Sequence, residues 1–355
     1  MSDRIPLLDL SIQHREVRAE IEAAFSKIID SNAFILGAQG KGLEEESTAY
    51  LGVKHAVGVA NGTDALLLAL RALKVGPGDE VILPAFTFVS TAEVVVHVGA
   101  TPVYADIDPD TYCLGEVKPT SKTKAILPVH LFGHPADMDR LSKHGIPLIE
   151  DGAQSYGATH KGRKTLAIGT IGCTSFYPSK NLGGWGDGGM CFTNDDAIAK
   201  ELRILRNHGW EKRYEPFLVA YNSRLDELQA AVLRVKLRKL DAWTADRIAA
   251  ARRYDALLKG AVGTPKVAPG MTHVYHTYMI RSPKRDAISA ALTKASIDNA
   301  VYYPNTIPST EAFRQKGSWP VAETMTRELL AIPIYPGISS AQQERVADVI
   351  RGAVR

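Results

Sequence analysis

The chain has 355 residues, with 45% hydrophobic and 23% charged side chains and a formal net charge of +3. This composition is typical of a globular protein, and the length suits two domains, or one large domain with a smaller one appended. Because the sequence has no basic tract interleaved with aromatic residues, we expect no nucleic-acid binding. A mildly basic balance still suits a doubly anionic substrate.

The cysteines and the N-terminus indicate the compartment. Cys113, Cys173 and Cys191 are odd in number, widely spaced and without a C-x-x-C pair, so we predict neither a disulfide framework nor a metal site. The segment from Met1 to Pro6 lacks the basic and apolar parts of a signal peptide, and no apolar run reaches transmembrane length. We therefore expect a cytoplasmic protein that does not interact with a membrane.

In chain order, the N-terminal part alternates helices with short apolar strands. Helices are predicted at 12–30, 65–73 and 89–98, and strands at 55–59, 80–83, 101–107, 125–129, 146–149, 168–173 and 189–193. The Gly-x-x-Gly-Lys sequence within 37–42 lacks the spacing of a phosphate-binding P-loop, so we expect a loop there, before a helix. Alternation of this kind predicts an α/β fold with a mostly parallel central sheet flanked by helices.

The C-terminal part has a different pattern. A helix opening at residues 222–225 is followed by a second helix at 245–258 and by a Gly- and Pro-rich linker. A strand at 273–280 and helices at 285–295 and 323–330 complete a smaller α+β unit. We therefore divide the chain into a large domain over 1–244, which includes the N-terminal helix, and a small C-terminal domain over 245–355.

The turn after the first predicted strand has the features of an anion site. Asn61, Gly62, Thr63 and Asp64 lie between that strand and an apolar helix. Free backbone amides and the helix dipole at such a position both favour a phosphate, which makes Gly62 and Thr63 candidates to bind one. The alternative is an ordinary capped helix, since these residue types also begin helices without any ligand.

Lys180 stands in an unusual setting for a lysine. It follows the strand at 168–173 and small hydroxyl residues, and it precedes a glycine-rich turn over 183–189 that allows close backbone approach to a ligand. A lysine held there can form a Schiff base with an aldehyde when burial or a nearby cation lowers its pKa. The alternative is a glycine-rich hairpin that carries an incidental lysine.

Asp151 provides the second chemical group. It directly follows the predicted strand 146–149, and the carboxyl ends of parallel strands are where open α/β sheets bind ligands. Taken alone, Asp151 is as consistent with a helix N-cap as with a ligand-binding carboxylate. Together with Lys180 it matches what a pyridoxal phosphate enzyme needs, namely a lysine for the Schiff base and a carboxylate for the protonated pyridine nitrogen.

Four motifs, in order, resemble the DegT/DnrJ/EryC1/StrS family of nucleotide-sugar aminotransferases. They are "NGTDALLLAL" at 61–70, "EDGAQSYGA" at 150–158, "SFYPSKNLGGWGDGG" at 175–189 and "NSRLDELQAAVL" at 222–233. The resemblance runs from "IPLLDL" near the start to "IPIYPG" near the end. It implies pyridoxal 5'-phosphate as cofactor and a fold of type I, similar to that of aspartate aminotransferase, with the large domain binding the cofactor.

The same resemblance implies roles for further residues. Phe88 would cover one face of the cofactor ring, Gln154 would lie near the ring oxygen, and the Ser175 hydroxyl would contact the phosphate together with Gly62 and Thr63. Asn222 would reach the phosphate in the partner's active site, which implies a homodimer with two composite sites. Arg224 is a candidate for substrate contact.

The expected reaction is amino transfer from glutamate, or glutamine, to a keto sugar carried on a nucleoside diphosphate. The form "FYPSKNLG…GDGG" resembles the branch that acts on 3-keto sugars, so C3 is the expected position. The sugar-pocket segment departs from the family, because Tyr302-Tyr303-Pro304 lacks its histidines and glutamine; Tyr302 and Tyr303 are the substrate candidates there. Transfer to C4 or to a keto-inositol, and a regulator that binds the cofactor without turnover, stay open as alternatives.

Overall fold

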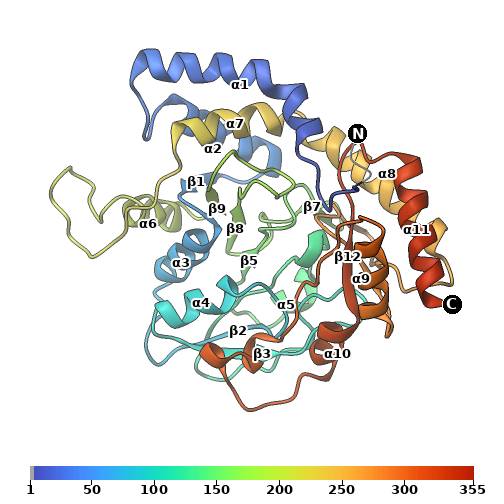
Figure 1. The fold of residues 1–355 in the computed structure, drawn as a ribbon. Coiled ribbons are helices and arrows are strands. Elements are labelled where there is room, and N and C mark those ends of the chain that lie inside the picture. The colour runs from blue at the N-terminus through green and yellow to red at the C-terminus, as the bar shows by residue number, and fades with distance from the viewer. Residues whose placement is uncertain (1–3) are drawn as a thin grey trace.

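The computed structural model describes residues 4–355, and one twisted sheet forms the centre of the molecule (Figure 1). Its strands are β1 (His55–Val59), β2 (Glu80–Pro84), β3 (Thr101–Ala105), β4 (Thr123–Ile126), β5 (Ile149–Asp151), β8 (Ile171–Ser175) and β9 (Gly189–Thr193). The order β3-β2-β4 continues through parallel bridges Ile126–Leu148 and Val129–Asp151 into β5-β8-β9-β1. Only β9 among these strands is antiparallel to its neighbours, so the predicted mostly parallel sheet is confirmed.

Some helices bury an apolar stripe against this sheet, and others pack on those helices as an outer layer. The helices of this part are α1 (Ser11–Ser31), α2 (Ala38–Leu51), α3 (Gly62–Ala72), α4 (Ser90–His97), α5 (Met138–Ser142), α6 (Asp196–Leu205) and α7 (Glu227–Leu237). Helix α3 packs on β8 and β9, and α4 packs on α3 and β3. Helix α2 lies between β1 and α7, and α1 packs on the far side of α7 (Figure 1). Buried Val17 and Ile21 of α1 make that last contact apolar.

The loop predicted over residues 37–42 is wrong from Ala38 onward, because α2 already begins there. The cause is a distant carboxylate. The buried side chain of Glu227 accepts hydrogen bonds from the backbone N–H groups of Gly37, Gln39 and Gly40, at 2.9, 2.7 and 2.8 Å. A helix N-terminus has unpaired N–H groups and a positive dipole end, and this carboxylate satisfies both.

The C-terminal part forms its own small core. It contains α8 (Leu240–Leu258), β11 (Tyr278–Arg281), α9 (Arg285–Lys294), α10 (Pro320–Glu328), β12 (Leu329–Ile332) and α11 (Ser340–Val354). Strands β11 and β12 pair antiparallel, and α11 packs on both α8 and α9. The division that we predict between 244 and 245 falls inside α8, so a continuous helix leads from one part into the other.

Two predicted elements of this part differ from the structure. The strand expected over 273–280 exists only from Tyr278, because the preceding residues leave the small sheet and bond to the body of the molecule; Val274 N–H, for example, donates to Gly133 O at 3.0 Å. The helix expected over 323–330 ends at Glu328, where β12 begins. A short strand, β10 (Met271–Thr272), joins β6 (Thr159–His160) and β7 (Arg163–Lys164) in a separate small sheet. Among residues 4–355, none of the helices combines the length and apolarity needed to cross a membrane.

Candidate active site

A cavity of about 740 Å³ opens at the carboxyl ends of β1, β2, β5 and β8. Its walls include nine of the eleven site residues predicted from the sequence: Gly62, Thr63, Phe88, Asp151, Gln154, Ser175, Lys180, Tyr302 and Tyr303. The remaining two, Asn222 and Arg224, are not among its lining residues. Residues that are far apart in the chain therefore converge here, as expected for strand ends of a parallel sheet.

Asp151 ends β5 and is 6% exposed. Its carboxylate accepts hydrogen bonds from the Thr91 hydroxyl at 2.8 Å and from the Ala153 N–H at 3.2 Å. Burial raises the pKa of Asp151, while the hydrogen bond from Thr91 and the nearby charge of Lys180 act in the opposite direction. Among the described residues no cation forms an ion pair with Asp151, so this buried anion is suited to a cationic ligand group.

Lys180 lies in the turn after β8, held by a hydrogen bond from its own N–H to Tyr177 O at 2.9 Å. Its ammonium group has neither a hydrogen bond nor an ion pair with any residue of 4–355. Burial lowers the pKa of Lys180 to about 8, and the charge of Asp151 partly opposes this shift. A larger fraction of the amine is therefore neutral, and nucleophilic, near physiological pH than for an exposed lysine.

The glycine-rich turn after Lys180 is fixed from α7. Gln229 accepts a hydrogen bond from Trp185 N–H at 2.8 Å, and the buried ammonium of Lys236 donates to Gly183 O at 2.7 Å. A side chain at Gly183 would place its Cβ 2.4 Å from Pro178 O, so only glycine allows the turn to close this tightly. The lysine is thus placed by a rigid scaffold.

The start of α3 forms an anion-binding corner of the cavity. Asn61 caps the helix by accepting from Asp64 N–H, which leaves the N–H groups of Gly62 and Thr63 without an acceptor in the described part of the chain. A Cβ on Gly62 would lie 2.6 Å from Ser175 Cβ, so the two segments touch. Free amides, a positive helix end and the Ser175 hydroxyl suit a phosphate group.

Gln154 links the cofactor side of the cavity to its outer wall. Its side-chain oxygen accepts from Phe132 N–H at 2.6 Å, and its amide nitrogen donates to the Tyr303 hydroxyl at 3.2 Å. The ring of Tyr303 lies 6.3 Å from that of Phe88, which is 53% exposed and therefore accessible to a flat ligand. Tyr303 is accordingly oriented by a predicted cofactor residue.

Asn222 and Arg224 lie elsewhere, in the segment before α7. Asn222 is exposed and forms a bridge with Asn207, while the Arg224 guanidinium donates to the Asn207 side chain at 3.1 Å. Between α6 and α7 the chain projects away from the body as a long arm (Figure 1). The exposed tip of this arm is mixed in character: charged side chains at 211–213 and Glu215 accompany Tyr214, and Val219 follows; Tyr214 is 72% and Val219 87% exposed.

The structure adds site residues that sequence reasoning missed. Ser90 bonds the Thr63 hydroxyl at 2.8 Å, and Thr91 bonds Asp151; both belong to a run that reads as a plain apolar helix. Their two adjacent hydroxyls, which follow Phe86 and Phe88 closely in the sequence, were the feature that could have indicated polar site residues here. His276 also lines the cavity, and no motif or spacing indicated it, because its segment has the alternation of a strand.

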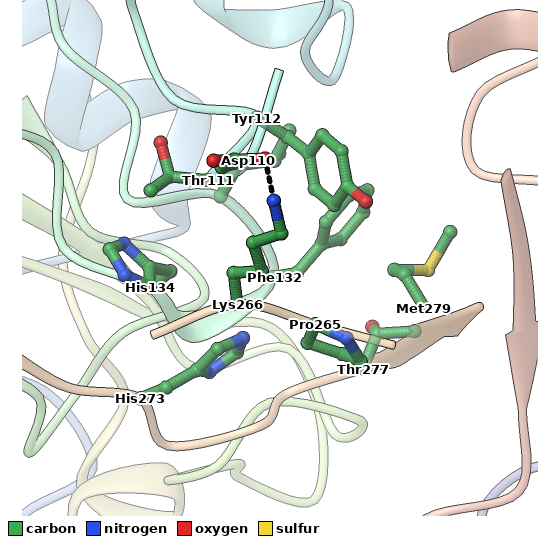
Figure 2. Close-up of a pocket in the computed structure, with 11 residues that line it drawn as sticks. Asp110, Thr111, Tyr112, Phe132, His134, Pro265, Lys266, His273, Thr277 and Met279 are labelled. Carbon is green, nitrogen blue, oxygen red and sulfur yellow. Dashed lines mark hydrogen bonds and ion pairs between the residues drawn. The ribbon is translucent and has the colours of Figure 1, made fainter. Parts of the chain in front are cut away.

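A second, much smaller cavity of about 10 Å³ lies behind this segment (Figure 2). It is lined by His134, His273 and the Lys266–Asp110 ion pair, and it shares Phe132 and Thr277 with the large cavity. Its volume is that of a single water molecule, so it is no substrate site. The part of the chain covered by the structure holds no group of three or more His, Cys, Asp or Glu placed to bind a metal ion.

The fold and the cavity define a class, the pyridoxal-phosphate-dependent enzymes of fold type I. The model of the DegT/DnrJ/EryC1/StrS aminotransferase family matches residues 15–351, and the chain belongs to this family. It is 46% identical over 98% of its length, and 97% of the relative's, to a UDP-N-acetyl-3-dehydro-alpha-D-glucosamine 3-aminotransferase of Acidithiobacillus ferrooxidans. It is 44% identical, with the same coverage, to the pleiotropic regulatory protein of Geobacillus stearothermophilus.

Solved structures agree. The crystal structure of DesV from S. venezuelae in complex with a ketimine intermediate has a TM-score of 0.96 and 42% identity over the full length of both chains. A sugar aminotransferase from Streptococcus pneumoniae in its PLP form has a TM-score of 0.88 and 26% identity, covering 95% of this chain and 96% of that one. The predictions of the family, the fold type, an aminotransferase and pyridoxal phosphate as cofactor are confirmed.

The residues present fit this cofactor. The corner of Gly62, Thr63 and Ser175 offers donors for its phosphate, Asp151 a buried anion for its ring nitrogen, and Lys180 an unpaired amine for its aldehyde. None of these groups forms an ion pair within the described chain. A bound group with one phosphate, one protonated nitrogen and one carbonyl satisfies all three.

Proposed function

We propose that this protein transfers an amino group from glutamate to C3 of a keto sugar carried on a nucleoside diphosphate. The observation that carries this function is the meeting of Lys180 and Asp151 in one cavity, each without an ion-pair partner. Relatives named for 3-dehydro and 3-oxo sugars on UDP, at 46% and 42% identity, support the substrate class and the C3 position. A relative of the same identity, 42%, is named for a 3-amino sugar on dTDP.

In this function each of four residues of the chain has a separate role toward the cofactor or the amino donor. When bound, pyridoxal phosphate supplies the carbonyl for covalent attachment and a ring that accepts electrons. Lys180 would hold the cofactor through its side-chain amine, and the same amine, once free, would act as the base that takes the proton from the donor's Cα and as the acid that returns a proton to complete the transfer. Asp151 holds the ring nitrogen protonated, Gln154 fixes the ring oxygen, and Phe88 covers one ring face.

The charge of the cavity wall supports a homodimer with composite sites. The cavity wall carries the acids Asp64, Asp151 and Asp187, but its basic side chains among the described residues are Lys180 and His276 alone. Glutamate and a nucleoside diphosphate together bring several negative charges, which this wall does not balance. Asn222 to the cofactor phosphate and Arg224 to the substrate, both from the partner subunit, would supply the missing donors.

The projecting arm between α6 and α7 supports this assembly. Among exposed charged residues it carries the large apolar side chains of Tyr214, Phe217 and Val219, at 72%, 62% and 87% exposure, which burial against a partner would remove from water. Burial of the arm against a second copy would bring the neighbouring Asn222 and Arg224 toward the other cavity.

Tyr302 and Tyr303 would line the sugar side of the cavity. We place the protein in the cytoplasm because all three cysteines are free and buried.

The test is the absorbance spectrum of the purified protein with pyridoxal phosphate. A visible band that glutamate bleaches, and that a 3-keto nucleotide sugar restores with formation of the amino sugar, is the expected result. Lys180→Ala should abolish the band, while Lys118→Ala, which changes an exposed lysine, should not.

The acceptors distinguish the alternatives. If only a 4-keto sugar or a keto-inositol restores the visible band, that compound is the acceptor and a 3-keto nucleotide sugar is not. A protein that stays colourless with the cofactor would refute an aminotransferase of any kind and favour a regulator, the function in the name of the Geobacillus stearothermophilus relative.

A further inference from the structure

His276 lies where the small C-terminal part meets the cavity. It belongs to the irregular segment 273–277, which leaves β10 and crosses the body before β11 begins. Its side chain lines the same cavity as Lys180, together with Thr277, Tyr302 and Tyr303. This wall is distinct from the one that holds the cofactor groups, because every residue of it comes from beyond position 270.

The backbone around His276 is firmly held. Val274 N–H donates to Gly133 O at 3.0 Å, and Val274 O accepts from the side chain of Asn181, the neighbour of Lys180, at 2.9 Å. Thr277 N–H donates to Phe132 O at 3.4 Å. The segment is so close to Gly133 that a Cβ there would lie 3.0 Å from His276 N. The position of His276 is therefore fixed before any substrate arrives.

The ring itself has no partner. Nδ1 of His276 is buried and makes no hydrogen bond with any group of residues 4–355. The other buried histidines nearby differ: in His134, Nδ1 bonds Pro135 O and Nε2 accepts from Ala268 N–H, and in His273, Nδ1 accepts from Tyr275 N–H. A fixed backbone with a free polar ring is the arrangement of a ligand-binding residue.

The ring is also kept neutral. Burial lowers the pKa of His276 well below its usual range, and the charges of Lys180 and Arg247 and the neighbouring His273 act in the same direction. A neutral imidazole offers one N–H donor and one acceptor nitrogen. The two nitrogens point away from each other, so each meets a separate group; either one suits a sugar hydroxyl, which can both donate and accept, whereas a carboxylate can only accept.

We propose that His276 hydrogen-bonds the sugar ring of the acceptor substrate, beside the carbon that receives the amino group, and takes no part in binding glutamate or the nucleotide. This role rests on the proposed function, since it requires a hydroxylated acceptor in the cavity. It makes His276 a specificity residue that distinguishes the two substrates of the reaction.

The experiment compares ligands that differ only in the sugar. Calorimetry measures the Kd of the protein loaded with pyridoxal phosphate for UDP and for UDP-N-acetylglucosamine, and for dTDP and dTDP-glucose. His276→Phe keeps an aromatic ring and removes both nitrogens. It should weaken binding of the nucleotide sugar about fivefold, the value of one or two neutral hydrogen bonds, and leave the Kd of the free nucleotide unchanged.

Two further readouts separate a sugar contact from a structural role. His276→Phe should raise KM for the keto sugar without changing the rate at which glutamate bleaches the visible band, and His276→Gln should recover part of the lost affinity. The melting temperature of the ligand-free protein should not fall, because the change removes a buried nitrogen that has no partner. His134 lines the small cavity (Figure 2) and makes two satisfied hydrogen bonds, so His134→Phe, which breaks both, should instead lower stability.

The outcomes are distinct. Equal affinity of wild type and His276→Phe for the nucleotide sugar, or an equal loss for the free nucleotide, would overturn the proposed contact alone. A slowed reaction with glutamate would overturn it as well, by making His276 part of donor binding. If the wild-type protein binds no nucleotide sugar more tightly than the nucleotide, the proposed function fails together with this inference.

Discussion

The environment of Lys180 sets the pH at which the protein captures its cofactor. Burial lowers the pKa of this lysine to about 8 from an ordinary value of 10.5. At pH 7 about one molecule in ten then carries a neutral amine, against about one in three thousand for an unperturbed lysine. The attachment rate of pyridoxal phosphate to the apoprotein should therefore rise with pH, reach half its maximum near pH 8, and level off above.

Asp151→Asn is the informative perturbation of this profile. The charge of Asp151 favours the protonated form of Lys180 and so raises its pKa, in opposition to burial. Removing the charge leaves burial alone, and the midpoint should move to lower pH. The expected displacement is about one pH unit, at the lower end of what an opposite charge at short range produces. Attachment below pH 7 should thus become faster in the variant, although turnover is lost.

Stopped-flow absorbance measures this directly. Apoprotein is mixed with pyridoxal phosphate from pH 6 to 10, and the growth of the visible band gives the rate; Lys180→Ala supplies the baseline. A wild-type midpoint near 10.5 would show that Lys180 is not desolvated as the structure requires. A midpoint that rises in Asp151→Asn would refute the assigned direction of the interaction between the two side chains.

Further outcomes are expected. Asp151→Asn should retain bound cofactor but slow the bleaching by glutamate by about 10²- to 10³-fold, measured in single turnovers. Phe88→Ala should weaken cofactor binding about tenfold in an equilibrium titration, because the ring loses its cover. Asn222→Ala and Lys180→Ala should each be inactive alone. Dimers that contain one subunit of each variant should regain activity at one of their two sites, because that site has both residues intact. A monomer in solution would refute the composite site. Glu227→Gln should lower the free energy of unfolding by about 1–2 kcal/mol, seen as a lower urea midpoint, since the start of α2 loses its charged cap.

The cofactor half of the cavity was predictable because it is built from strand ends. Asp151 and Lys180 each follow an apolar run that reads as a strand, and parallel strands bring their carboxyl ends together whatever the length of chain between them. Gly62 and Thr63 follow in the same way from the strand–turn–helix pattern. The assignments of Phe88 and Gln154 came from family motifs, since neither periodicity nor spacing identifies them.

The parts that sequence reasoning missed depend on contacts between distant segments. The start of α2 is set by Glu227, which lies 187 residues beyond Gly40, and no local pattern records such a cap. The segment before Tyr278 alternates as a strand should, but its hydrogen bonds go to Gly133 and Asn181 instead of a neighbouring strand. Tertiary bonds therefore override the local pattern at the residues that we propose to form the substrate wall.

The two walls of the cavity are joined through one hydrogen-bonded chain. Gln154 accepts from Phe132 N–H, and Phe132 O accepts from Thr277 N–H, so Gln154 and the segment 273–277 bond the same residue through its two adjacent peptide units. Asn181 forms a second link, from the residue after Lys180 to Val274 O. A displacement of the segment by an incoming sugar would therefore be felt at both the ring oxygen and the lysine. Through these bonds, sugar binding at the proposed substrate wall would change the positions of Gln154 and Lys180, the groups assigned to amino transfer.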